Sequence, residues 1–108
     1  MKRWINILID KNTTLLETMK IIDNSSLQFA VVVDDANYLL GTVTDGDIRR
    51  GILRGEGLDV PIKQVMNPSP ITASIENTYS DCLNKLKKHK LKQLPIVDRQ
   101  NKVIDVLF

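Results

Sequence analysis

The stretch of the chain richest in possible chemistry runs from Gly41 to Arg50 and joins the end of an apolar segment to a helical pattern. Thr44 and Asp47 stand where we predict a helix N-terminus, and the unpaired backbone N–H groups of such an end attract anions. Asp47 can accept hydrogen bonds from ribose hydroxyls, while Thr44, Arg49 and the backbone amides can hold a phosphate. The turn therefore predicts a nucleotide site.

Two plainer interpretations of the same turn stay open. Asp45 and Asp47 can simply cap a helix that begins near Ile48, and the turn alone supports capping and ligand binding equally. The order Asp45-Gly46-Asp47 also has the form of a metal-binding Asp-x-Asp pair. No further carboxylate or histidine cluster completes a shell of hard ligands, so we predict no metal site.

The unit that carries this turn occurs twice. At an offset of 64 residues, residue class matches without a gap between 7–44 and 71–108. Each copy is predicted to hold a short strand, an amphipathic helix, an apolar strand ending in aspartate, a polar turn and a second strand. Such repeats usually bury their apolar faces against each other, so we predict two half-domains that share one core. The identical pairs are Ile7 with Ile71, Thr14 with Thr78, Leu27 with Leu91, Val33 with Val97, Asp34 with Asp98 and Asn37 with Asn101.

The helix of each copy is predicted to begin at a threonine. Thr14 and Thr78 are followed three residues later by Glu17 and Asp81, which is the spacing of a capping box. Apolar residues then recur at helical spacing and predict the face that packs on the core. These are Leu15, Met19 and Ile22 in the first copy, and Tyr79, Cys82, Leu83 and Leu86 in the second.

The remaining elements follow from apolar runs and turn residues. Strands are predicted at 29–33 and 38–44 in the first copy and at 94–97 and 102–108 in the second, with a short helix at 48–53. We divide the chain into a first motif at 1–54, a packed connector at 55–69 and a second motif at 70–108.

Composition limits the class of protein. The chain has 108 residues, of which 43% are hydrophobic, which suits one compact domain. Its net charge of +2 gives no bulk attraction to nucleic acid or to an anionic membrane. Cys82 has no partner for an internal disulfide, which favours a cytoplasmic protein. No nucleophile lies beside a base, so we predict that the chain is not an enzyme.

Lysines gather between Lys85 and Lys92, around the single histidine, His89. We interpret them as a solvated helix face, because no aromatic residues are interleaved for base stacking. Binding of RNA or polyphosphate through this run is an alternative. Lys92 is the exception, since it lies on the side where we expect the ligand.

Taken together, these motifs resemble the tandem cystathionine-β-synthase (CBS) domain pair, or Bateman module. The resemblance covers nearly the whole chain and is carried by residues 13–15, 29–34, 41–48, 65–68 and 94–98. It implies an α/β (α+β) fold of two pseudo-symmetric β-α-β-β-α motifs packed sheet to sheet. It also implies a regulatory module that binds AMP, ADP, ATP or S-adenosylmethionine between the motifs, requires no other cofactor and pairs into a homodimer.

The resemblance also implies roles for individual residues. Thr44 is expected to contact phosphate, Asp47 the ribose hydroxyls and Thr42 the base or sugar. Arg49 and Lys92 are the cations expected nearest the phosphate, ahead of Arg50. Adenine is expected to lie between Pro70, Ile71 and Thr72 on one side and Leu91, Lys92 and Gln93 on the other.

The second, pseudo-symmetric site departs from this pattern. Gly41 corresponds to Asp105 and Thr44 to Phe108, whose ring cannot bind phosphate, so we predict a degenerate site. The sequence also stops within its last predicted strand, which we interpret as truncation of a longer protein. Similar pairs precede bacterial sugar-nucleotidyltransferase-like domains, so the resemblance implies a C-terminal enzyme domain of that kind. The alternative is a structural or dimerisation module that binds no nucleotide.

Overall fold

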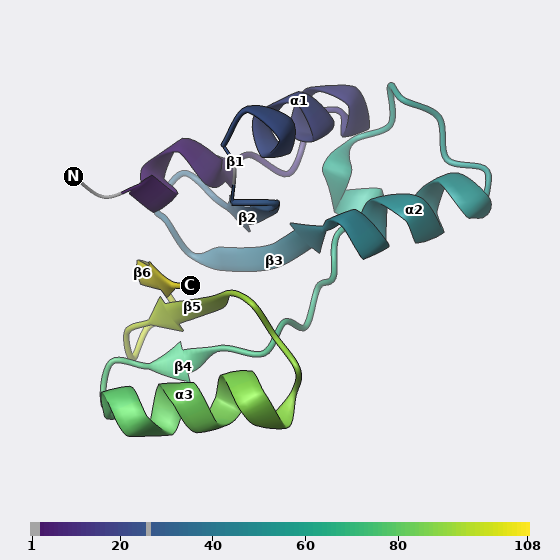
Figure 1. Ribbon diagram of the computed structural model, residues 1–108. Helices are drawn as coiled ribbons and strands as arrows, with labels where there is room; N and C mark the ends of the chain where they lie inside the picture. Colours follow the sequence, from purple (N-terminus) through teal and green to yellow (C-terminus); the bar gives the residue numbers. More distant parts are fainter. Residues whose placement is uncertain (1–2, 26) are drawn as a thin grey trace.

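The computed structural model describes residues 3–25 and 27–108. It contains two stacked units, each a three-stranded sheet with helical segments on its outer side (Figure 1). The first unit and the segment after it contain η1 (Arg3–Ile7), β1 (Leu8–Ile9), α1 (Leu15–Ser25), β2 (Phe29–Val33), β3 (Leu39–Thr44), α2 (Asp45–Leu53) and η2 (Ile62–Gln64). The second contains β4 (Ala73–Ser74), α3 (Tyr79–Lys88), β5 (Leu94–Val97) and β6 (Val103–Leu107).

The two sheets have the same strand order and the same strand directions. In the first, β2 lies parallel to β1 and antiparallel to β3; in the second, β5 lies parallel to β4 and antiparallel to β6. The antiparallel register shifts between Val32 and Val33 and, at the equivalent positions of the repeat, between Ile96 and Val97. The predicted repeat is confirmed down to this irregularity.

The two repeat helices begin at the predicted threonines. The Thr14 hydroxyl accepts a hydrogen bond from the Glu17 amide at 3.1 Å. The Thr78 hydroxyl accepts from the Asp81 amide at 3.1 Å, and the Asp81 carboxylate accepts from the Thr78 amide at 2.9 Å. The second helix therefore begins with a complete capping box.

One face of α3 differs from the prediction. Cys82 is buried, but Tyr79 and Leu83 are 68% and 39% exposed, although helical spacing predicted that they face the core. In the first copy α2 and η2 complete the core that buries Leu15. In the second copy the corresponding cluster has only three buried residues, Ala73, Cys82 and Leu94, so the described core covers less of α3.

The main core lies between the two sheets. Ile7, Phe29 and Val31 from the first unit pack with Val103 and Val106 from the second, and all five are buried. Each such side chain contributes about 1.5–3 kcal/mol when fully removed from water. The prediction of sheet-to-sheet packing around one shared core is therefore confirmed.

Two matching turns fasten the units together at one end. The Asn37 side-chain amide donates to the Val103 carbonyl at 2.7 Å, and the Asn101 side-chain amide donates to the Leu39 carbonyl at 3.2 Å. The backbone reciprocates, because the Leu39 amide donates to Asn101 and the Val103 amide donates to Asn37. Both asparagines have positive φ, 71° and 68°, a conformation that asparagine tolerates better than most residues.

The segment between the units packs on the first unit. Ile62 is fully buried there, and its amide donates to the Thr13 carbonyl at 2.7 Å. Asn67 pairs with Thr42 through hydrogen bonds in both directions, at 2.8 and 3.0 Å. A Cβ on Gly41 would lie only 2.6 Å from the Asn67 carbonyl oxygen. Glycine at this position therefore allows the segment to approach β3 beside the cleft described next.

Candidate ligand-binding site

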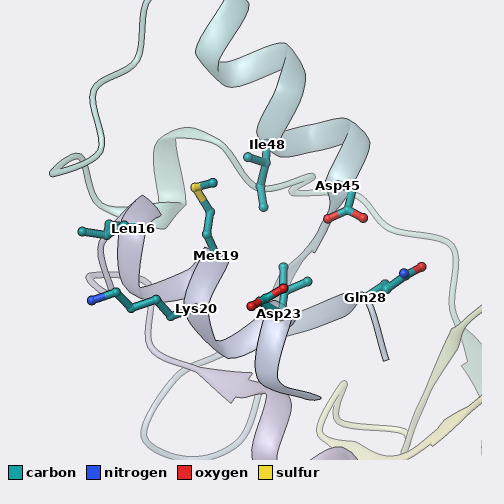
Figure 2. Close-up of a pocket in the computed structure, with 8 residues that line it drawn as sticks. Leu16, Met19, Lys20, Asp23, Gln28, Asp45 and Ile48 are labelled. Atoms are coloured by element: carbon teal, nitrogen blue, oxygen red, sulfur yellow. The ribbon is translucent and has the colours of Figure 1, made fainter. Parts of the chain in front are cut away.

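One cavity of the described residues lies away from the predicted site. This groove of about 490 Å³ lies within the first unit, between α1 and α2. Figure 2 shows Met19 and Ile48 pointing toward each other from the two helices, with the Asp23 and Asp45 carboxylates at one side. The groove is lined by Leu16, Met19, Lys20, Ile22, Asp23, Gln28, Asp45 and Ile48.

The second cavity, of about 220 Å³, lies between the two copies and collects most of the predicted site. Its walls come from the ends of β2 and β3, from the start of α2, from the segment before β4 and from β5 and its approach. The residues that line it are Phe29, Thr42, Thr44, Asp47, Arg50, Asn67, Pro70, Ile71, Leu91, Gln93 and Pro95. We call this cavity the cleft.

The polar end of the cleft is the Thr44–Asp47 turn, and it is also a capping box of α2. The Thr44 hydroxyl accepts from the Asp47 amide at 3.2 Å, and Asp47 Oδ2 accepts from the Thr44 amide at 2.9 Å and from the Thr44 hydroxyl at 3.1 Å. Asp47 Oδ1 accepts from Arg50 Nη2 at 2.8 Å. Capping and a place in the cleft are therefore not exclusive, because both hold for the same two side chains.

Arg50, rather than Arg49, lines the cleft. Residues three apart lie on the same helix face, so Arg50 reaches back over Asp47, whereas Arg49 points elsewhere and is exposed. From the sequence we expected Arg49, ahead of Arg50, to lie nearest the phosphate. The i, i+3 spacing from Asp47 to Arg50 is the signal in the sequence that favours Arg50 over Arg49 as a lining residue of the cleft.

The second copy forms the apolar wall. Ile71 and Leu91 line the cleft, and Gln93 crosses to the first copy, where its side-chain amide donates to the Leu27 carbonyl at 2.9 Å. Thr72 is not among the lining residues; its carbonyl instead accepts from Lys85 Nζ at 2.8 Å, which ties it to α3.

Three lining residues were not predicted, namely Phe29, Asn67 and Pro95, and a fourth, Arg50, was ranked only after Arg49 and Lys92. Phe29 is the repeat counterpart of Gln93, so extending the pseudo-symmetry from the predicted Gln93 would have identified it. Asn67 enters through its pairing with Thr42, a contact between the connector and a strand that no local pattern reveals.

A groove of about 260 Å³ adjoins the cleft and shares Thr44, Leu91 and Gln93 with it. It brings Lys92, a predicted site residue, beside the turn together with Lys90. Lys92 therefore lies near the polar end of the cleft, outside the cleft itself. The full lining is Gln28, Thr44, Asp45, Gly46, Lys90, Leu91, Lys92 and Gln93.

The equivalent of this turn in the second copy has different chemistry. Asp105 occupies the position of Gly41, and its carboxylate accepts from the Val106 amide at 2.8 Å. Phe108 occupies the position of Thr44 and is 48% exposed. A phenyl ring has no group that binds phosphate, so the prediction of a degenerate second site still stands on residue chemistry.

Two other kinds of site are not found in the part of the chain that the structure describes. Within it, no three His, Cys, Asp or Glu side chains gather closely enough to hold a metal ion. No helix in the same residues is long and apolar enough to cross a membrane.

Two copies of one strand–helix–strand–strand unit, packed sheet to sheet with a cleft between them, define a tandem-repeat α+β module. The chain belongs to the CBS domain family, whose model matches residues 5–54 and 62–107. The match includes both copies, so the chain is a tandem CBS pair.

Comparison with individual proteins agrees with this assignment. The chain is 30% identical over 91 residues to arabinose 5-phosphate isomerase GutQ of Salmonella typhi, an alignment that covers 84% of this chain and 28% of GutQ. The chain therefore spans less than a third of that relative. The CBS protein PAE2072 from Pyrobaculum aerophilum, solved with AMP, has a TM-score of 0.80 at 18% identity and covers 99% of this chain and 86% of its own. The CBS pair of protein MJ0100, solved with 5′-methylthioadenosine and S-adenosyl-L-methionine, has a TM-score of 0.79 at 23% identity. This match covers 94% of this chain and 82% of the MJ0100 chain.

Proposed function

We propose that the chain is a regulatory module that binds an adenosine nucleotide or a related adenosyl ligand in the cleft between its CBS copies. The observation that carries the proposal is the composition of the cleft. A carboxylate, a hydroxyl and a guanidinium stand at one end, and aliphatic side chains from the other copy form a wall. The structures of PAE2072 with AMP and of the MJ0100 pair with adenosyl ligands support it.

In this proposal the adenine packs against the apolar side chains of Ile71 and Leu91. These side chains form no hydrogen bonds with the base, so they distinguish little between adenine and other bases. The ribose hydroxyls donate to Asp47 Oδ1, which has one hydrogen bond, from Arg50, whereas Oδ2 already accepts two from Thr44. The 5′ end of the ligand then points toward the N-terminus of α2, where the polar groups lie.

Regulation follows from the position of the ligand between two copies. A ligand can shift a protein between two states only through its different affinity for them. A ligand that contacts both copies at once binds more tightly when the two copies are close enough for both walls of the cleft to touch it. An attached domain that senses this arrangement would be controlled by it.

The identity of the attached domain is also a proposal. The sequence resemblance favours a nucleotidyltransferase-like domain, whereas GutQ is a sugar-phosphate isomerase. Of the two, the alignment supports the isomerase and offers nothing for the nucleotidyltransferase.

The test is thermal unfolding and calorimetry of the chain with adenosine, AMP, ATP and S-adenosylmethionine. A ligand that binds only the native state raises the unfolding midpoint. Asp47→Asn removes the charged acceptor, and we expect it to weaken binding about tenfold or more, the scale of a hydrogen bond to a charged group.

Asp81→Asn is the matched control, because Asp81 closes the same capping box on α3 and lies outside the cleft. It should lower stability as Asp47→Asn does while leaving affinity unchanged. Equal affinity of the wild type and Asp47→Asn would show that the site is assigned wrongly. If none of the four ligands raises the midpoint, the alternative of a structural module is favoured.

The groove of Figure 2 supports a second proposal, that the module forms a homodimer. Its floor is apolar, with Met19 and Ile48 facing it, and its rim carries Lys20 as well as Asp23 and Asp45. A twofold axis at this groove would pair the patch with itself, so the rim of one copy, with Lys20 and the two carboxylates, would face the same rim on the other.

A further inference from the structure

Arg50 is held at the polar end of the cleft by two features of its own helix. Its Nη2 donates to Asp47 Oδ1 at 2.8 Å. The guanidinium also lies against Gly46, where a Cβ would come within 3.2 Å of Nη1. The carboxylate and the missing side chain together fix the group in the cleft.

This contact leaves Arg50 with unused donor capacity. A guanidinium carries five N–H donors in a planar fork that suits a phosphate. The Arg50 side chain is 59% exposed, whereas that of Asp47 is only 14% exposed. The carboxylate is therefore enclosed and paired, whereas more than half of the arginine side chain, which lines the cleft, is open to solvent.

The charges around this corner favour an anion. Lys90 and Lys92 line the adjoining groove, and Asp45 is the carboxylate that opposes them. Asp47 is already neutralised by Arg50. A phosphate placed beside Arg50 therefore meets more positive than negative charge, and the adjoining groove offers room for further phosphates.

We propose that Arg50 is the residue that makes the cleft selective for adenosine ligands carrying a 5′-phosphate. The inference rests on the proposed function and narrows it. Asp47 holds the ribose and keeps Arg50 in place, while Arg50 binds the phosphate. The ligand is therefore an adenosine 5′-phosphate and not an uncharged or cationic adenosyl compound such as 5′-methylthioadenosine or S-adenosylmethionine.

The experiment compares adenosine with AMP on three proteins: the wild type, Arg50→Ala and Arg49→Ala. Arg49 is the matched control, because it is the neighbouring exposed arginine of the same helix and does not line the cleft. We expect the wild type to bind AMP about tenfold to a hundredfold more tightly than adenosine, the scale of a charge-assisted hydrogen bond. Arg50→Ala should lose this preference, and Arg49→Ala should keep it.

Adenosine separates the role of Arg50 from general damage to the site. Arg50→Ala should bind adenosine at least as well as the wild type, since it frees Asp47 Oδ1. The preference for AMP should also shrink as salt is added, because salt screens exposed charges. Arg50→Lys should retain part of the preference, because it keeps the charge without the fork.

Four results would overturn the inference. Equal AMP preference in Arg50→Ala and the wild type would show that another group binds the phosphate. A parallel loss of adenosine and AMP would show that Arg50 acts only by positioning Asp47. Binding of adenosine without any gain for AMP would refute phosphate selection while sustaining the proposed function. Failure of the wild type to bind either compound would refute the inference, and it would refute the proposed function as well if ATP and S-adenosylmethionine also failed to bind.

Discussion

Asp47 shows how one carboxylate can serve the fold and the site together. Its Oδ2 closes the cap of α2, while its Oδ1 holds Arg50 in the cleft. Substitution of such a residue changes stability and binding at once, so a loss of binding is not by itself evidence of contact with the ligand. Asp81, which caps α3 with the same geometry, separates the two effects.

A second prediction about a single residue concerns Asp81, whose contribution to stability should depend on pH. The backbone hydrogen bond from Thr78 is the main cause that lowers the pKa of Asp81 below its ordinary value of 3.8, and the Thr78 hydroxyl adds to it. Because the folded pKa is the lower one, this stabilisation is fully present above the ordinary pKa and is lost as the pH falls through the folded pKa.

Asp81→Asn should therefore lower the unfolding midpoint at neutral pH and converge with the wild type in acid. The measurement is the thermal midpoint of both proteins at pH values above and below 3.8. A difference that stays constant across this range would mean that the charge of Asp81 contributes nothing to stability.

At the scale of elements, the clearest feature is the pair of asparagine turns that join the units. Asn37→Gly removes the hydrogen bond to the Val103 carbonyl but still permits a positive φ, and should cost about 0.5–1.5 kcal/mol. Asn37→Ala adds the strain of a left-handed conformation, a further ~1–2 kcal/mol. Urea unfolding of the two variants checks this, and equal losses would show that the positive φ is not maintained in solution.

The elements that the sequence predicts well are those with strong local signals. Thr14 and Thr78 mark helix starts correctly, and the apolar runs place β2 and β5 at the predicted residues. The exposure of Tyr79 could not be predicted from helical spacing, because burial of a helix residue depends on which other elements pack against that helix. In the site, most of the residues that the repeat motif predicted line the same cleft. Asn67 could not be predicted because it joins the cleft through a tertiary contact, and the choice between Arg49 and Arg50 depends on the helix face on which each lies.

At the scale of the whole molecule, the two repeats are not independent domains. Val31 from one sheet and Val106 from the other lie in the same core. Separation of the sheets would expose this surface, so we expect the two repeats to unfold together. One outer face of the module carries the groove of Figure 2.

The homodimer proposed at that face gives a prediction of its own. Met19→Glu puts a charge on the floor of the groove and should weaken self-association at least tenfold, because an unpaired charge would be buried. Leu53→Glu is the control, since Leu53 is 79% exposed and lies outside the groove. Analytical ultracentrifugation measures both. A monomeric wild type, or equal association of the two variants, would refute the proposal.

The asparagine turns have a mechanical consequence. Within the first sheet, Phe29 pairs with Thr44 at one end of the β2–β3 ladder and Val33 pairs with Leu39 at the other. The ligand cleft therefore lies at the end of the ladder opposite the reciprocal asparagine bonds. At the asparagine end the repeats are joined by two side-chain and two backbone hydrogen bonds, whereas at the cleft end Gln93 donates across to the Leu27 carbonyl. If a ligand draws the two walls of the cleft together, we expect the repeats to turn about the more heavily bonded asparagine end, and helices far from that end to move farther than those near it.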